Sequence, residues 1–339
     1  MTVAKWPVAE LHVHIEGTLE TELLVALARR NDVALPSYDP DVLRELYRFT
    51  DLQSFLDIYY ANLAVLRTEA DFYDLGMAYL TRASAAGVRR AEIFFDPQTH
   101  LANGIQLDVV FGGLTRSLVD ARETFGISAD LILCFLRHLG GQAALETLEA
   151  AIPFLDQFIG VGLDSAEVGF PPSLFTEAFA KAEALGLRRV AHAGEEGGPD
   201  YVHEALDLLG VERVDHGIRA VEDPRLVEIL RERQIPLTVC PLSNVCLRAT
   251  PTLGAHPLPA MLAAGLLVTI SSDDPAYFGG YVDDNLDALQ NEFGLDHAQM
   301  ATLARNSFRA AFLPEAEKRR HIEAVEEHLE GLLRLTSGA

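Results

Sequence analysis

Eight short apolar runs alternate with longer stretches of helical periodicity, and this alternation constrains the fold of the 339-residue chain more than any other feature. Several runs are almost continuous in Val, Ile, Leu and Phe, as strands buried on both faces are. A βα alternation repeated eight times predicts a (β/α)8 TIM barrel. The candidate strands are Val8–Ile15, Val88–Phe94, Leu131–Phe135, Phe158–Leu163, Leu187–His192, Arg213–His216, Leu237–Val239 and Leu267–Ser271.

The connection between the first two candidate strands is long for a single crossover. Its helical patterns cover Leu19–Arg30, Val42–Arg48, Leu52–Arg67 and Glu69–Gly87. We therefore expect a partly helical insertion at about residues 19–87, after the first strand and near the barrel mouth. The tail from Asp296 to Leu335 is also predicted to be helical. Because no repeat, low-complexity tract or interdomain linker interrupts the pattern, residues 1–339 are predicted to form one domain.

Charge and composition exclude several classes of partner. The formal net charge is -23, and an acidic surface repels phosphate backbones, so no nucleic-acid partner is expected. The apolar stretches are too short to span a bilayer and the N-terminal residues lack a signal-peptide pattern, so we expect a soluble, cytoplasmic protein without a membrane partner. Three irregularly spaced cysteines predict no disulfide framework, which fits a reducing compartment. None of these patterns predicts an oligomeric state.

Side chains that bind metals gather where the predicted strands end. His12 and His14 lie two positions apart on the first strand, so both imidazoles face the same side. His192 ends the fifth strand, and Asp273 follows the eighth. The His-x-His pair alone equally describes two buried core histidines. Active sites of this fold lie at the C-terminal rim, however, so the four side chains are expected to converge there on one zinc-like ion.

Three further residues remain for proton handling and substrate binding. Glu195 lies in a Gly-rich turn after His192, and enclosure beside a ring substrate would raise its pKa and make it an acid. His216 ends the sixth strand and either completes the metal shell or orients a hydroxide. Successive strand residues point in opposite directions, so Asp273 is assigned to the metal and Asp274 to the substrate. This division of tasks predicts a metal-assisted hydrolysis.

These segments resemble the adenosine/adenine deaminase family of zinc-dependent (β/α)8 enzymes. The resemblance covers nearly the whole chain, and its matching segments are Glu10–Glu20, His192–Pro199, Asp215–Gly217, Thr238–Asn244 and Ser271–Gly280. It implies one zinc ion per chain, with the ligands His12, His14, His192 and Asp273. It also implies that Glu195 donates a proton to the ring, that His216 assists the attacking hydroxide, and that Asp274 binds the purine.

Within the family, the sequence is most similar to the bacterial and fungal adenine deaminases, which act on the free base. Glu16 stands where adenosine deaminases usually carry Asp, and Ser165–Glu167 replaces a typical Gly-Asp-Glu segment of nucleoside deaminases. The segment Phe94–His100 also resembles the adenine branch. Longer side chains at Glu16 and in Ser165–Glu167 are expected to fill the space that a ribose needs. The implied reaction converts adenine, a small-molecule purine base, to hypoxanthine and ammonia in purine salvage.

Several alternatives remain open at this level. An adenosine deaminase, or a deaminase of N6-substituted adenines, would use the same chemistry. A two-metal amidohydrolase often bridges its metals with a carboxylated lysine after the fourth strand, but Phe158–Gly169 contains no lysine. A barrel that only binds a ligand should have lost a metal ligand or the acid, yet all seven positions are filled. Iron, manganese and cobalt also suit a histidine–carboxylate site.

Overall fold

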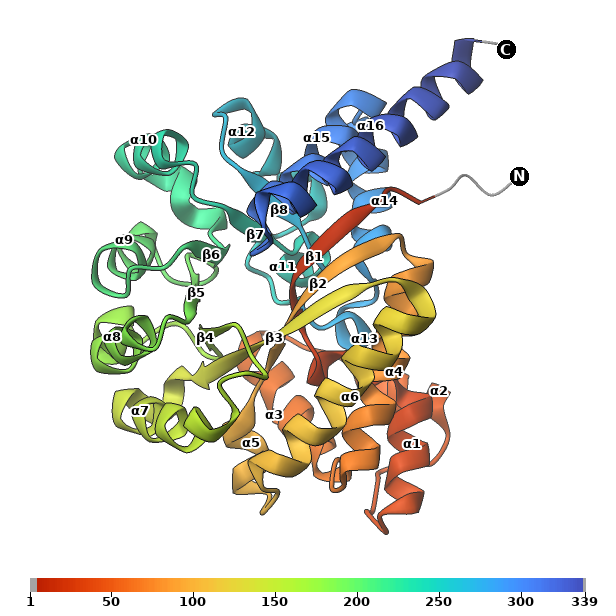
Figure 1. Cartoon of the computed structure of the whole chain (residues 1–339), viewed down its shortest axis with the longest axis vertical. Helices are drawn as coiled ribbons and strands as arrows, with labels where there is room; N and C mark the ends of the chain where they lie inside the picture. The colour runs from red at the N-terminus through yellow and green to blue at the C-terminus, as the bar shows by residue number, and fades with distance from the viewer. Residues whose placement is uncertain (1–4, 338–339) are drawn as a thin grey trace.

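The computed structural model describes residues 5–337 and contains eight parallel strands that follow one another in chain order (Figure 1). The strands are β1 (Val8–His14), β2 (Val88–Phe95), β3 (Ser128–Leu136), β4 (Gly160–Asp164), β5 (Arg188–Ala193), β6 (Arg213–His216), β7 (Leu237–Val239) and β8 (Val268–Ile270). Each overlaps one of the eight predicted runs. The predicted (β/α)8 barrel is therefore confirmed, with all its strands ending at the same rim.

The barrel closes just beyond the end of β8. The backbone N–H of His14 donates to the carbonyl of Asp273 at 3.0 Å, and the N–H of Asp273 donates to the carbonyl of His12 at 3.1 Å. Two residues before Asp273, the Ser271 hydroxyl accepts a hydrogen bond from the N–H of Leu11. The main chain that joins the two ends of the sheet thus also carries three of the candidate metal ligands.

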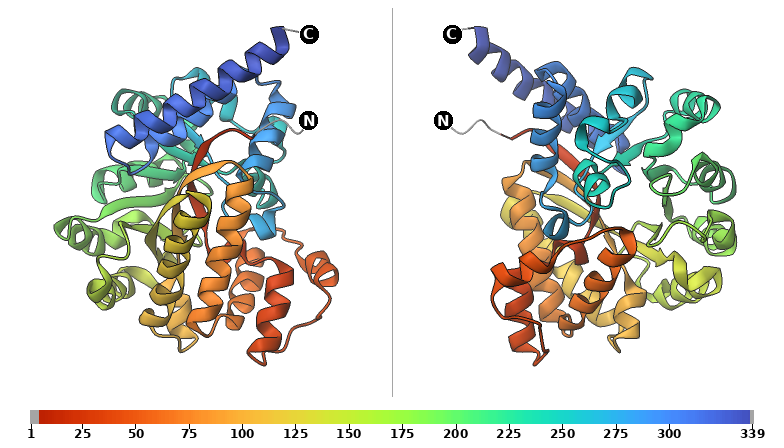
Figure 2. Two further views of the ribbon diagram at one scale, coloured as in Figure 1. Left: turned by 45° about the vertical axis from the view of Figure 1, so that its right-hand side comes forward. Right: turned by 180° about the vertical axis from the view of Figure 1, so that it is seen from behind.

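Helices surround the barrel on its outer side (Figure 2). The ring and C-terminal helices are α4 (Glu69–Ala85), α6 (Leu107–Phe125), α7 (Gly140–Ala151), α8 (Thr176–Ala184), α9 (Pro199–Leu208), α10 (Pro224–Arg233), α12 (Leu258–Ala263), α14 (Val282–Phe293), α15 (His297–Ala310) and α16 (Glu315–Ser337). Helix α16 projects beyond the barrel toward the C-terminus. None of the helices within residues 5–337 combines the length and apolarity that crossing a bilayer requires.

Three short helices start at the barrel rim itself. They are α5 (Pro97–Ala102), α11 (Pro241–Cys246) and α13 (Pro275–Phe278); one residue separates α5 from β2 and α11 from β7, and four residues separate α13 from β8. All three have Pro within their first two positions, where the missing N–H would have no helical partner. The proline at the start of each helix turns the chain sharply at the rim. The residues before it, among them Asp96 and Asp274, face the barrel mouth.

Part of the range of about residues 19–87 forms the insertion after β1. It consists of α1 (Thr21–Arg30), α2 (Pro40–Leu46) and α3 (Leu52–Asn62). Helix α4 instead belongs to the ring, because it packs closely on α6, where a Cβ at Gly113 would overlap the backbone of Glu69. The part of the insertion that reaches the barrel mouth is α3, whose side chains line the cavity described below.

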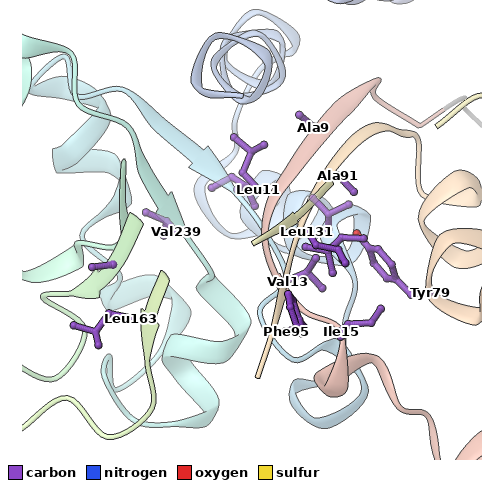
Figure 3. Close-up of a cluster of buried hydrophobic side chains, with 14 of the residues drawn as sticks. Ala9, Leu11, Val13, Ile15, Tyr79, Ala91, Phe95, Leu131, Leu163 and Val239 are labelled. Carbon is purple, nitrogen blue, oxygen red and sulfur yellow. The ribbon is translucent and has the colours of Figure 1, made fainter. Parts of the chain in front are cut away.

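Two apolar layers hold the barrel together. The larger one lies between the strands and the helices, and Figure 3 shows part of it, including Val13, Phe95 and Tyr79. The smaller one contains Phe94, Ile132, Cys134 and Val190. The ring of Phe94 lies 5.1 Å from the rings of both His12 and His14, so this inner cluster forms an apolar floor beneath the imidazoles.

Candidate active site

Three histidines and one aspartate converge at the C-terminal rim. One ligand atom from each of His12, His14, His192 and Asp273 lies within 4.8 Å of the others, and all four residues are buried. The Nε2 atoms of His14 and His192 are 3.2 Å apart. The Asp273 Oδ1 atom lies 3.2 Å from the Nε2 of His12 and 3.4 Å from that of His14. The structure therefore brings together the four side chains predicted to bind the metal.

The donor set fits a divalent cation. The Nε2 atom of His12 is fully buried and has no hydrogen-bond partner within residues 5–337. Its Nδ1 atom contacts the Thr238 hydroxyl at 2.9 Å, and that hydroxyl donates to Asp215 at 2.8 Å. The Ser243 hydroxyl similarly donates to Asp273 Oδ2 at 2.6 Å. Outer contacts of this kind orient metal ligands, so the unpartnered Nε2 is directed at the cluster.

Asp273 and Asp274 both face the cavity. Their assignment to different tasks assumed that successive strand residues point in opposite directions, and this assumption was wrong. Strand β8 ends at Ile270, so the alternation of a strand does not apply to either residue. Asp273 has a left-handed backbone with φ 66°, and Pro275 begins α13 directly after Asp274. A Cβ at Gly17 would overlap the Asp274 carboxylate, so this close approach requires glycine.

The loop that carries Glu195 is held by a second carboxylate. Glu167 is buried, and its Oε1 accepts the N–H of Gly194 at 2.7 Å. Its Oε2 accepts the N–H groups of Glu195, Glu196 and Gly197 at 3.1, 2.8 and 2.8 Å. Four consecutive main-chain donors thus converge on one carboxylate. Glu167 fixes the position from which the Glu195 side chain enters the cavity.

A chain of hydrogen bonds sets the tautomer of His216. The backbone N–H of Leu258 donates to His256 Nδ1 at 3.0 Å, which leaves the ring proton of a neutral His256 on Nε2. That Nε2 lies 3.2 Å from Asn244 Oδ1, and Asn244 Nδ2 lies 3.3 Å from His216 Nδ1. The amide therefore donates to Nδ1, and the proton of His216 is on Nε2. This atom faces Glu195 Oε2 at 3.5 Å and Asp273 Oδ2 at 3.8 Å.

Burial raises the pKa of carboxyl groups around the cluster and lowers the pKa of His216. Removal from water raises the pKa of Glu195 well above its ordinary value, and the charge of Asp273 raises it further. Burial lowers the pKa of His216 to about 3, so this imidazole is neutral. Burial and the neighbouring Asp273 also raise the pKa of Asp274. A carboxyl group with a raised pKa and a neutral imidazole therefore lie side by side.

The cluster opens into a small cavity at the barrel mouth. Its polar side contains the candidate site residues His14, His192, Glu195, His216, Asp273 and Asp274. Its opposite side is largely apolar and comes from the insertion, with Leu52, Phe55, Leu56, Tyr59 and Tyr60 of α3. The cavity thus combines polar groups at the strand ends with an apolar cover, an arrangement typical of small-molecule sites.

The structure modifies the expectation that Glu16 and the Ser165–Glu167 segment fill the ribose space. Only Ser165 lines the cavity, where its hydroxyl contacts Tyr60 and His138 at 3.1 and 2.9 Å. Glu16 is fully buried, accepts the N–H of Asp96 at 3.0 Å and contacts His100 at 2.8 Å. Glu16 and Glu167 therefore act from behind the cavity wall, by fixing the segments that form it.

Several residues of the site were not among the predicted ones. Asp96 and Asp164 line the cavity, whereas Asn244 and His256 support His216 from behind. Asp96 and Asp164 follow the apolar runs of β2 and β4, so the rule that selected the candidate metal ligands would also have selected them. The role of Glu167 has no such signal, because its partners lie at least 27 positions away along the chain.

We expect the Glu167→Gln substitution to lower kcat by ~10-fold or more, because small displacements of reacting groups are costly. The NH₂ group of the new glutamine side chain would face main-chain N–H groups that need an acceptor. The loop would therefore shift and displace Glu195. Metal content should remain at the wild-type level, which separates this effect from damage to the cluster. The half-buried neighbour Glu196, changed to Gln, is the matched control. A Glu167→Gln enzyme with wild-type kcat would show that the loop holds its position without this carboxylate.

A parallel barrel with three histidines and an aspartate at its C-terminal rim, beside a buried acid, is characteristic of metal-dependent hydrolases. The chain belongs to the adenosine deaminase family, whose sequence pattern matches residues 7–328. This match confirms the family resemblance drawn from the sequence motifs, and with it the prediction of an enzyme.

Individual relatives are similar over almost the whole chain. An adenine deaminase of Streptomyces coelicolor is 63% identical over 314 residues, which cover 93% of this chain and 92% of the relative. The crystal structure of an adenine deaminase from Arthrobacter aurescens has a TM-score of 0.94 and 54% identity, covering 96% of this chain and 99% of that one. An amidohydrolase from Burkholderia ambifaria, crystallised with bound zinc, has a TM-score of 0.89 and 28% identity, covering 98% of this chain and 93% of that one.

Proposed function

We propose that this protein is a zinc-dependent adenine deaminase that hydrolyses adenine to hypoxanthine and ammonia, a reaction of purine salvage. The observation that carries the proposal is the convergence of His12, His14, His192 and Asp273 beside the buried acid Glu195, inside one cavity. The names of the relatives at 63% and 54% identity support the choice of adenine as the substrate.

The metal ligands in this proposal are His12, His14, His192 and Asp273, holding one ion per chain. The unpartnered Nε2 of His12 and the 3.2 Å approach of two other Nε2 atoms support a cation among them. The zinc in the Burkholderia ambifaria structure supports zinc as its identity. When bound, such an ion makes a water-derived nucleophile available near neutral pH.

Glu195 is proposed as the general acid. Because burial raises its pKa, its carboxyl group retains a proton near neutral pH. It delivers this proton to the ring nitrogen beside the carbon that bears the amino group. Negative charge then does not accumulate on the ring while the new C–O bond forms. The backbone of Glu195, fixed by Glu167, keeps the acid within reach of that nitrogen.

His216 and Asp274 orient the reactants. The Nε2–H of neutral His216 faces both Glu195 and Asp273, so it can hold the attacking oxygen beside the reacting carbon. Asp274 has an Oδ1 atom without a hydrogen-bond partner in the described part of the chain, and we assign it to the imidazole edge of the base. The apolar side chains of α3 cover the ring and exclude bulk water, which strengthens these contacts.

A substrate panel tests the proposal directly. We expect the purified, zinc-loaded protein to release ammonia from adenine with a kcat/KM at least ~10-fold higher than from adenosine, because a ribose must fit beside the buried carboxyl groups of the cavity. The panel includes N6-methyladenine, with hypoxanthine formation measured in parallel. Comparable values for adenine and adenosine would refute the free-base assignment and leave the deaminase chemistry in place. Preferred turnover of N6-methyladenine would reassign the substrate.

A further inference from the structure

The cavity contains a second pair of carboxyl groups that the proposed mechanism does not use. Asp96 directly follows β2, and Asp164 ends β4. Both line the cavity, and each is only 2% exposed. One oxygen atom from each lies within 4.8 Å of the other and of a ring nitrogen of His14. Two acidic side chains thus lie together at the cavity wall, where their burial has to be offset by some partner.

The oxygen atoms of this pair are poorly satisfied by the protein. Apart from the contact between the two carboxyl groups themselves, Asp96 Oδ1 and both oxygens of Asp164 have no hydrogen-bond partner within residues 5–337. Asp96 Oδ2 receives only a long contact from the Tyr59 hydroxyl, at 3.5 Å. Asp164 Oδ2 lies 3.5 Å from His14 Nδ1. Buried acceptors are almost always paired in folded proteins, so these atoms are available to a donor that enters the cavity.

Their position around the barrel identifies which edge of a substrate they meet. Asp96 and Asp164 come from the β2–β4 side of the rim, whereas Glu195, His216 and Asp274 follow β5, β6 and β8. A planar base whose reacting edge is held on the second side directs its remaining edge toward the first. In a free purine base that edge carries the N–H of N9, the imidazole nitrogen farther from the reacting carbon, whereas Asp274 meets the nearer nitrogen, N7. In a nucleoside N9 carries the sugar and has no hydrogen to donate.

We propose that Asp96, with Asp164 beside it, accepts a hydrogen bond from the ring N–H of a free purine base and thereby rejects purines substituted at that nitrogen. This inference rests on the proposed function, because it specifies how the same site distinguishes a base from a nucleoside. A site built to pair with an N–H discriminates strongly against an analogue that lacks it, since the acceptor is then left buried and unpaired. Asp96 is the better test residue, because Asp164 also contacts His14.

The experiment compares adenine with 9-methyladenine, which lacks the ring N–H but adds far less bulk than a ribose. Both substrates are measured with the zinc-loaded wild type and with the Asp96→Asn, Asp96→Ala and Tyr60→Phe variants. We expect the wild type to prefer adenine by at least ~10²-fold in kcat/KM. Asp96→Ala should reduce this preference at least tenfold, mainly through loss on adenine, and Asp96→Asn should give an intermediate value. Tyr60→Phe, which changes another cavity side chain, should retain the wild-type preference.

The possible outcomes separate this inference from the function on which it rests. A wild type without turnover of adenine would refute the proposed function itself. A wild type that deaminates adenine, together with Asp96 variants that keep the full preference, would overturn only the role of Asp96. A second metal ion, present in the wild type and lost in Asp96→Asn, would also overturn it by identifying the pair as a cation site. If Asp96→Ala fails to fold, the isosteric Asp96→Asn variant decides between these results.

Discussion

Replacing Glu195 with Gln is expected to lower kcat by ~10²–10⁴-fold, the range typical of general acid catalysis, while bound metal should stay at the wild-type level. Gln keeps the size of the side chain and its capacity for hydrogen bonding, but it has no acidic proton to deliver. Burial raises the pKa of Glu195 and so favours the protonated carboxyl group that the proposed mechanism requires. Steady-state kinetics on adenine, with metal analysis of the same preparation, measure both quantities.

Glu196 provides the control for this substitution. It is the adjacent residue in the same loop, and it is half-buried, whereas Glu195 is buried. Glu196→Gln should therefore retain nearly wild-type kcat. If Glu195→Gln retains turnover and Glu196→Gln loses it, the acid has been assigned to the wrong residue. If both variants retain turnover, proton transfer to the ring does not depend on this loop.

His14→Ala is expected to remove both metal and activity together. The substitution takes away one of four converging ligand atoms, the one that lies 3.2 Å from His192 and 3.4 Å from Asp273. Since the loss of one of four ligand atoms weakens the binding of the ion, metal content should fall well below one ion per chain. Turnover should fall below detection, because the nucleophile depends on the ion. Elemental analysis and kinetics on the same samples test the correlation.

His203 is a suitable comparison for that experiment. It lies on α9, half-buried, with its Nε2 3.0 Å from Asp223, and it belongs to none of the histidine clusters at the rim. His203→Ala should keep full metal content and activity. Full turnover by wild-type protein that has been stripped of metal would contradict the metal assignment altogether, whatever the variants do.

The sequence was sufficient to predict the barrel and the convergence of the candidate metal ligands because both depend on local patterns. Apolar runs locate strands, and the parallel arrangement brings all strand ends to one rim, so His12, His192 and Asp273 meet although they are far apart in the chain. The same reasoning failed for Asp273 and Asp274. It treated them as strand residues, whereas the left-handed backbone at Asp273 turns both toward the cavity.

Other parts of the site depend on tertiary contacts that no local pattern encodes. Glu16 was predicted to fill space in the cavity. Its carboxylate instead accepts the N–H of Asp96 and contacts His100 behind the cavity wall. The insertion was predicted to extend to residue 87, yet its last helix belongs to the ring, which only the packing of α4 on α6 reveals. The cover formed by α3 likewise follows from how the insertion folds back over the mouth.

The hydrogen bonds behind His216 have a fixed polarity, and that polarity originates in the main chain. The N–H of Leu258 can donate but never accept, so His256 and Asn244 must each accept on one side and donate on the other. A peptide group outside the cavity thereby dictates which ring nitrogen of His216 carries hydrogen. The donor is a main-chain group, so a substitution of the buried Leu258 that keeps the packing of α12 leaves the tautomer of His216 unchanged, whereas proline would remove the donor.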